Sequence, residues 1–320
     1  MSDICFIGVD TSNYTTSVAI LGADGKLYAN LKKLLFVEEG ARGLRQSDAL
    51  FLHTKNLPEI FERAREVISE NSLRPIAIGV SSRPRNQEGS YMPCFLSGRA
   101  VAYASAAMLD IPVYEFSHQC GHIAAAIYSA DKESLFDVEK IGAFHISGGT
   151  TELLLARPIR GGFDADIVGG TLDLNAGQAI DRIGVKMGLR FPCGAEMERL
   201  ASANTRKLPK PKLSMQGCSF NLSGLENKAT QLFEESKDAS YTSAFVFDFI
   251  GRSIVEASLS FAEKYGDMPI VYAGGVMSNS AIKAHIKKNI SDPYFAEPSM
   301  SADNAVGVAV LTARAWKDKN

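Results

Sequence analysis

The sequence FHISGGTTELLLA, residues Phe144–Ala156, predicts two apolar strands joined by a tight Ser-Gly-Gly turn. Glycine has no Cβ and tolerates positive φ, so Ser147, Gly148 and Gly149 would let a ligand approach the backbone closely. Successive backbone N–H groups in such a turn form a nest that binds anions. We therefore expect a phosphate-binding turn at the end of this strand.

The same pattern occurs at two other places in the chain. Within Ile4–Ile20, one apolar strand ends at Asp10, Thr11 and Ser12 and a second strand returns. The stretch IVYAGGVMSNS, residues Ile270–Ser280, again leads from an apolar strand into a turn of small and polar residues. Three such strands predict one phosphorylated ligand held between two lobes.

Size and composition predict an ordinary globular protein. The chain has 320 residues, which is long enough for two domains, each with its own hydrophobic core. Of these residues, 46% are hydrophobic and 22% are charged, as in an ordinary globular protein. Its net charge of -2 produces no global basic field, which counts weakly against a polyanionic partner. The five cysteines are odd in number and form no CxxC pair, so neither a disulfide framework nor a cysteine zinc cluster is indicated.

The sequence shows no sign of membrane insertion or secretion. It begins with MSDICFIGVD, which leads into a strand with no basic segment before an apolar run. No apolar run approaches the roughly 18 residues that a membrane-spanning helix needs. We expect a cytoplasmic protein with no membrane partner.

Hydrophobic periodicity predicts two similar α/β halves. The first half is expected to contain strands at 4–9, 15–21, 26–36, 76–81 and 111–114, and helices at 47–71, 98–109 and 118–128. The second half is expected to contain strands at 141–146, 151–156, 166–171 and 269–273, and helices at 175–187, 195–203, 240–265, 280–289 and 303–316.

Two histidines have the spacing of metal ligands. His118 and His122 lie four residues apart, so a helix would place both imidazoles on one face. Asp303, at the start of the last predicted helix, would complete a site of mixed nitrogen and oxygen ligands that suits zinc or iron(II). On spacing alone, two surface or capping histidines are the simpler interpretation.

The ordered motifs along the chain resemble those of the TsaD family. They are IGVDTS, SVAI, SHQCGH, ISGGTTELLL, AGQAIDRIG, FNLSGL, AGGVMSN and SADNAVGVA, and together they span nearly the whole sequence. The resemblance implies the α/β fold of the actin-like ATPase (ASKHA, ribonuclease H-like) superfamily, with a nucleotide cleft between two duplicated lobes. It places these lobes at 1–138 and 139–302, with the last helix, within 303–320, packing back on the first lobe.

The family transfers a threonylcarbamoyl group from threonylcarbamoyl-AMP to N6 of a tRNA adenosine. The resemblance implies a divalent metal, iron or zinc, on His118, His122 and Asp303, and it implies catalytic roles for Asp10, Thr11 and Ser12. It also implies an adenine nucleotide, either ATP/AMP or threonylcarbamoyl-AMP, at Ser147, Gly148, Gly149, Asp181, Gly194 and Asn279. The expected partners are tRNA and proteins of the TsaB and TsaE types.

Four positions depart from the family's motifs. Cys120 stands where the family carries Glu, Thr150 where it carries His, and Tyr14 with Thr15 where it carries an acidic pair. We expect Cys120 to be a small packed thiol rather than a ligand. The departures keep two alternatives open: a paralogue that carbamoylates another acceptor, and a nucleotide-binding scaffold without catalysis. Retention of both histidines and Asp303 argues against the scaffold.

One basic run suggests contact with nucleic acid. Arg206, Lys207, Lys210 and Lys212 lie in a predicted proline-containing loop and would contact phosphates. A solvated loop without a ligand is the more common outcome for such a run.

Overall fold

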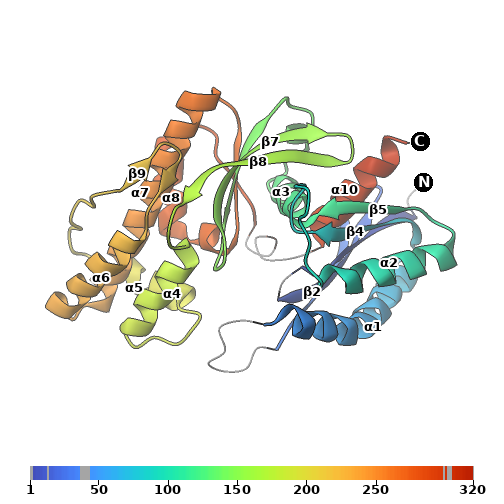
Figure 1. Cartoon of the computed structure of the whole chain (residues 1–320), viewed down its shortest axis with the longest axis horizontal. Helices are drawn as coiled ribbons and strands as arrows, with labels where there is room; N and C mark the ends of the chain where they lie inside the picture. The colour runs from blue at the N-terminus through green and yellow to red at the C-terminus, as the bar shows by residue number, and fades with distance from the viewer. Residues whose placement is uncertain (1–2, 13, 37–43, 298–299, 301–304, 320) are drawn as a thin grey trace. The chain divides into compact units, whose positions relative to one another are not determined.

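The computed structural model describes residues 3–12, 14–36, 44–297, 300 and 305–319 (Figure 1). Its contacts divide the chain into two compact units. Unit 1 comprises Met1–Asp137, Arg157–Ala165 and Asp303–Asn320, and unit 2 comprises Val138–Ala156 and Asp166–Ala302. The predicted α/β class therefore takes the form of two separate α/β bodies.

Unit 1 is built on a five-stranded sheet with the strand order β3-β2-β1-β4-β5. The strands are β1 (Ile4–Asp10), β2 (Thr15–Gly22), β3 (Leu27–Leu34), β4 (Arg74–Arg83) and β5 (Val113–Ser117). The first three strands form an antiparallel meander, whereas β4 is parallel to both β1 and β5. Because parallel strands end at the same edge of a sheet, the residues that follow β1, β4 and β5 come together.

Helices cover both faces of this sheet. They are α1 (Gln46–Glu70), α2 (Phe95–Leu109), α3 (His118–Ser129) and α10 (Val306–Lys317), with a short 3₁₀ turn, η1 (Glu133–Phe136). Ile78 and Val80 of β4 belong to a core cluster that includes residues of α1 and α2. Gly79, between them, faces Thr312 of α10 on the opposite side. Figure 1 shows α1 and α2 on one side of the strands and α3 and α10 on the other.

A close helix crossing positions α3. A Cβ atom at Gly307 of α10 would lie 1.8 Å from the carbonyl oxygen of Gly121 in α3. The two backbones are therefore in direct contact, which only glycine permits at this point. Since α10 also packs on β1 and β4, the crossing fixes α3 against the sheet.

Unit 2 is built on a seven-stranded sheet with the order β12-β11-β6-β7-β8-β10-β9. The strands are β6 (Ile141–Ile146), β7 (Thr151–Ile159), β8 (Gly162–Thr171), β9 (Met215–Gln216), β10 (Ser219–Phe220), β11 (Ile270–Ala273) and β12 (Tyr294–Phe295). The helices are α4 (Ala176–Lys186), α5 (Gly194–Ser202), α6 (Ser223–Ser236), α7 (Ala239–Tyr265) and α8 (Ser280–Asn289), and η2 (Gly275–Ser278) is a 3₁₀ turn. In its core, the ring of Phe144 stacks on that of Tyr272 at 5.6 Å.

Most predicted elements are present, and the differences have physical causes. Helix α6 was not predicted. Only Leu225, Ala229 and Leu232 of its 14 residues are buried, so its apolar periodicity in the sequence is weak. Residues 204–219 were expected to form a loop, but β9 lies within them and β10 begins at their last residue; β12 was not predicted either. Helix α10 begins at Val306, later than predicted, and Asp303 lies outside the described residues.

Two further expectations concern cysteines and membranes. All five cysteines are free and buried, so the prediction of no disulfide framework is confirmed. Among the described residues, no helix combines the length and apolar character needed to cross a membrane.

The helix crossing yields a testable prediction. Gly307→Ala would force α3 and α10 apart and lower the free energy of unfolding by about 1–3 kcal/mol, as overpacking does. Gly224→Ala is the matched control, because no described atom lies within 4 Å of its Cβ position and the change removes a helical glycine. Urea denaturation would contradict the packing if both variants showed equal stability.

Candidate functional site

A buried carboxylate organises the end of the sheet in unit 1. Asp10 closes β1 and is only 1% exposed. Its Oδ1 accepts a hydrogen bond from the backbone N–H of Ser12 at 2.8 Å, and its Oδ2 accepts one from the hydroxyl of Ser81 at 2.6 Å. His118 Nδ1 lies 2.8 Å from the same Oδ2. Asp10 thus joins residues that follow or end β1, β4 and β5.

These contacts keep Asp10 ionised. Burial on its own would raise the pKa of the carboxyl, but the charge and hydrogen bond of His118 oppose it. With the donors Ser12 and Ser81, they hold the pKa of Asp10 below its ordinary value. A carboxylate anion therefore faces Nδ1 of His118 and orients the imidazole ring.

The second nitrogen of His118 points to His122. The two Nε2 atoms lie 2.8 Å apart, as the predicted spacing of four residues on α3 allows. Two unprotonated ring nitrogens would repel at this distance, so one of them carries a proton that the other accepts. A carboxylate behind one histidine is also the usual support of a metal-bound imidazole. The donor set fits a divalent metal, although the described residues contain no group of three metal-ligating side chains.

Thr11 and Ser12, the other predicted catalytic residues, differ in their contacts. The hydroxyl of Thr11 donates to the carbonyl of Cys94 at 3.0 Å and accepts from the N–H of Gly98, so it holds the start of α2. The hydroxyl of Ser12 is buried and has no hydrogen-bond partner among the described residues. Ser12 is therefore the better candidate for a ligand contact.

Of the three motif departures in unit 1, Cys120 and Thr15 are buried and Tyr14 is exposed. Cys120 is 2% exposed, and its thiol donates to the carbonyl of Phe163 at 3.2 Å, which confirms the prediction of a packed thiol. Asn86 donates to the same carbonyl at 2.7 Å. Thr15 is buried within β2, whereas the ring of Tyr14 is 37% exposed.

In unit 2, the Ser-Gly-Gly turn is open at its glycines and held by two hydrogen bonds. The N–H of Ser147 donates to the carbonyl of Thr150 at 2.8 Å, and the side chain of Asn175 donates to the carbonyl of Gly149 at 2.9 Å. Neither Gly148 nor Gly149 adopts a positive φ, so the turn does not use that freedom of glycine. What their lack of a Cβ provides is space, since no described atom lies within 4 Å of either Cβ position.

Helix α4 supports this turn from behind. A Cβ at Gly177 would lie 2.6 Å from the carbonyl oxygen of Ser147, and the N–H of Gly177 donates to that oxygen at 3.3 Å. The turn thus sits against the first residues of α4. The positive end of a helix dipole favours an anion at such a place.

Asp181 connects α4 to the start of α5. Its Oδ1 accepts from the backbone N–H of Cys193 at 2.7 Å, and burial raises the pKa of the carboxyl. Gly194, which directly follows Cys193, begins α5, and no described atom lies within 4 Å of its Cβ position. The two predicted nucleotide residues are therefore brought together by one hydrogen bond.

Asn279 follows η2, whose preceding residue, Gly274, packs closely against the backbone of Ile146. Gly274, which precedes η2, has φ +100°, and a Cβ there would lie 2.1 Å from the carbonyl oxygen of Ile146. This places the η2 loop beside the strand end that leads into Ser147. Asn279 Oδ1 caps α8 by accepting from the N–H of Ile282, while its buried Nδ2 has no hydrogen-bond partner among the described residues.

The sequence analysis did not identify Glu198, one helical turn after Gly194. Its Oε1 accepts from both the N–H and the hydroxyl of Ser280, at 2.8 and 2.6 Å. Both residues line a cavity of about 280 Å³ between α5, α7 and α8. The sequence did contain one signal for Glu198: it lies four residues after Gly194, so the two residues share one face of α5.

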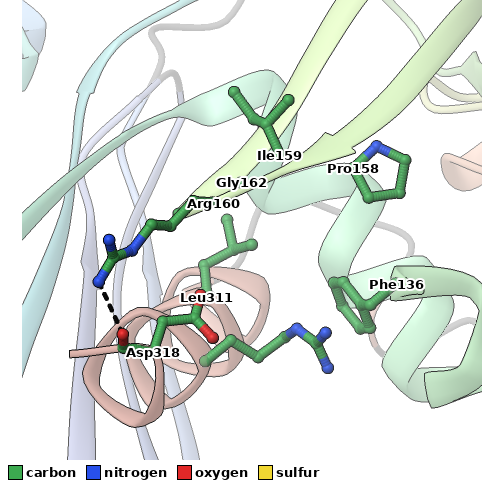
Figure 2. Close-up of a pocket in the computed structure, with 9 residues that line it drawn as sticks. Phe136, Pro158, Ile159, Arg160, Gly162, Leu311 and Asp318 are labelled. Carbon is green, nitrogen blue, oxygen red and sulfur yellow. Dashed lines mark hydrogen bonds between the residues drawn. The ribbon is translucent and has the colours of Figure 1, made fainter. Parts of the chain in front are cut away.

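A second cavity, of about 220 Å³, lies in unit 1 between the β7–β8 turn and α10 (Figure 2). Arg160 donates to the backbone carbonyl of Asp318 at 2.6 Å across it. Arg314 also lines it, with its guanidinium 4.4 Å from the ring of Phe136. None of the predicted site residues lines this cavity.

Comparisons with known proteins identify the family to which the chain is similar. A family model described as tRNA N6-adenosine threonylcarbamoyltransferase (TsaD) matches residues 47–310. A relative of that name from Thermus thermophilus is 30% identical over 320 residues, which cover 99% of this chain and 93% of the relative.

Solved structures support the fold. The crystal structure of full-length HypF in its phosphate- and nucleotide-bound form has a TM-score of 0.61 at 13% identity, over 99% of this chain and 46% of that chain. Component A of (R)-2-hydroxyglutaryl-CoA dehydratase from Acidaminococcus fermentans has a TM-score of 0.54 at 13% identity, over 98% of both chains. These likenesses show the fold alone and confirm the predicted ASKHA class. Because the family model and the curated relative both span most of its length, the chain belongs to the TsaD family.

Proposed function

We propose that this chain transfers a threonylcarbamoyl group from threonylcarbamoyl-AMP to N6 of a tRNA adenosine. The observation that carries the proposal is the chain of contacts from Asp10 through His118 to His122, together with membership of the TsaD family. The two proposed lobes, at 1–138 with 303–320 and at 139–302, correspond to units 1 and 2 except for Val138, which belongs to unit 2, and residues 157–165, which belong to unit 1. A cytoplasmic enzyme is expected.

His118 and His122, with Asp303 as the third ligand, would hold the metal. Iron or zinc suits this donor set. When bound, the metal supplies Lewis-acid polarisation of the carbamoyl donor. Asp10 acts as a positioning residue, because it fixes the ring of His118 with its Nε2 directed toward His122.

The nucleotide site is formed in unit 2. The open turn at Ser147, Gly148 and Gly149 receives phosphate oxygens, with α4 behind it. Asp181 holds ribose hydroxyls, and Gly194 leaves room for the adenine. Asn279 offers its unpaired amide to the base or the phosphates.

The reaction itself requires little of the protein beyond orientation and charge stabilisation. The N6 amine attacks the carbamoyl carbon, a C–N bond forms, the bond from that carbon to the phosphate oxygen of AMP breaks, and N6 loses a proton. The backbone N–H groups of the Ser-Gly-Gly turn are suited to stabilise the negative charge that develops on the leaving phosphate.

The two alternatives make different predictions in one experiment. The purified protein is incubated with threonylcarbamoyl-AMP and an unmodified tRNA transcript, and digested nucleosides are analysed by mass. Threonylcarbamoyladenosine in the digest supports the proposal. Turnover of the donor without modified adenosine supports a paralogue with another acceptor, and nucleotide binding without turnover supports a scaffold.

A TsaB-type partner would dock on the outer face of α2. That face exposes Tyr103, Met108 and Leu109, with Ala100 and Ala104 beside them. The only charged side chain of the helix is Arg99, which pairs with Glu115. A helix that is apolar on all sides is normally buried, so this face is suited to a protein partner. A TsaE-type ATPase is the other expected partner.

The role of Asp10 predicts a change in metal affinity. Asp10→Asn removes the carboxylate behind His118 and lowers the affinity for zinc by about 10–100-fold in a competition assay with a chromophoric chelator. Asp248→Asn is the matched control, because Asp248 also contacts a histidine, His285, at 2.9 Å, but in unit 2. Equal affinities for all three proteins would contradict the assignment.

Asn279 allows stability and binding to be separated. Asn279→Ser retains an oxygen that caps α8, but it removes the buried amide donor. We expect the free energy of unfolding to stay within about 0.5 kcal/mol and the dissociation constant for ATP to rise about tenfold. Asn279→Ala should lose both functions, with about 1 kcal/mol less stability. Unchanged ATP affinity in the serine variant would exclude a ligand role for this amide.

The α2 face predicts a loss of complex formation without a loss of fold. Ala104→Glu places a charge in the centre of the apolar face and should abolish co-elution with a TsaB-type protein. Ala284→Glu makes the same change at an exposed position of α8 and should leave the complex intact. Both variants should keep the wild-type melting temperature, and a complex that survives Ala104→Glu would rule out this face.

A further inference from the structure

The segment between α5 and β9 carries a concentrated positive charge. Residues Arg206–Lys212, which we name the basic loop, have the sequence RKLPKPK, with four cations and no acidic residue. The loop forms no helix or strand, and both elements that flank it are labelled in Figure 1. Neither the metal site nor the nucleotide site described above uses it.

The start of the basic loop is fixed to α7. The guanidinium of Arg206 lies 3.3 Å from Asp238 Oδ2 and 4.0 Å from the centre of the Tyr241 ring. Asn204 accepts from the N–H of Arg206 and donates to its carbonyl, at 3.1 and 2.9 Å. Arg206 therefore anchors the loop and does not serve as a free cation.

The rest of the loop is also restrained. Leu208 and Leu213 pack against the core of unit 2. Pro209 and Pro211 fix their own φ angles and favour extended backbone in the residues before them. A loop held in this way loses little conformational entropy when it binds a partner.

The three lysines of the loop point to solvent. Lys207, Lys210 and Lys212 are exposed, and none of them forms an ion pair or hydrogen bond with the described part of the chain. Other cations of unit 2 are paired, such as Lys186 with Glu226 and Arg199 with Glu196. The loop therefore holds three uncompensated charges on a fixed backbone.

Their spacing favours an extended polyanion over a single small anion. At about 3.3 Å per residue in extended chain, Lys210 and Lys212 are up to about 7 Å apart. Lys207 and Lys212 are up to about 17 Å apart by the same measure. Three ammonium groups spread along an extended segment match successive phosphates of a nucleic-acid strand better than a single phosphate group.

The basic loop borders the proposed nucleotide site of the same unit. Leu208 lines the cavity of about 280 Å³ together with Glu198 and Ser280. Ser280 directly follows Asn279, and Glu198 lies one helical turn after Gly194. A polynucleotide held by the loop would thus lie beside the residues proposed to bind the adenine nucleotide.

We infer that Lys207, Lys210 and Lys212 bind the phosphate backbone of the RNA substrate. The inference rests on the proposed function, which supplies the RNA, and it adds the surface that holds it. Contacts to phosphates position a nucleic acid without reading its sequence, so the loop acts on RNA in general. An acidic protein segment is the competing occupant, and the experiment must distinguish the two.

The test compares two triple variants of the full chain. K207Q/K210Q/K212Q removes the loop charges, and K55Q/K228Q/K317Q removes three exposed lysines from other helices. An unmodified tRNA transcript is titrated over a series of KCl concentrations, with fluorescence anisotropy as the signal. We expect the loop variant to bind about tenfold or more weakly and to lose about 2 from the slope of log K against log [KCl]. The control variant and K207R/K210R/K212R should behave nearly as the wild type.

The outcomes separate this inference from the proposed function. Calorimetric titration with ATP shows whether each variant retains its nucleotide site. If the loop variant binds the transcript with the wild-type affinity and slope, the inference is overturned and the proposed function stands. If the wild type binds ATP but no transcript, the proposed function fails and the inference fails with it. If the loop variant loses binding to polyglutamate but not to the transcript, the loop is a protein-binding surface and the inference is again overturned.

Discussion

The hydrogen bond between Asp10 and His118 is the constraint on which the rest of unit 1 depends. A carboxylate that is 1% exposed must be surrounded by donors, because an uncompensated buried charge is costly. Those donors come from the ends of three separate strands or the residues beside them, and only a sheet with β1, β4 and β5 side by side supplies them. The contact between Gly307 of α10 and Gly121 of α3 then fixes the position of α3, which carries His118, against the sheet.

Unit 2 satisfies a different constraint, which is the close approach of backbone to backbone. Gly177 brings α4 against the Ser147 turn, and Gly274 brings the η2 loop against Ile146. Any side chain at these two positions would separate the elements. The result is an open turn with the start of a helix behind it, an arrangement that favours the binding of a phosphate group. The proposed metal-binding histidines lie in unit 1 and the proposed nucleotide contacts in unit 2.

Local pattern predicted the elements well but not the contacts between them. The strands β1 and β2 are continuous apolar runs and α7 is long and largely buried, so both kinds of element can be recognised from the sequence. The spacing of His118 and His122 is visible in a single helix. The contact between Asp10 and His118 spans 108 residues, so only the sheet topology brings it about. The roles of Thr11 and Ser12 were predicted as equal, yet one hydroxyl is used by α2 and the other is unpaired. Helix α6 was missed because its apolar face is narrow.

The central claim is that Asp10, His118 and His122 form the support of a metal site. The most direct measurement is the metal content of the purified protein and of three variants, His118→Ala, His122→Ala and His285→Ala, by inductively coupled plasma mass spectrometry. We predict about one equivalent of iron or zinc in the wild type and in His285→Ala, and almost none in the other two. Metal that remains at the wild-type level in both His118→Ala and His122→Ala would contradict the account.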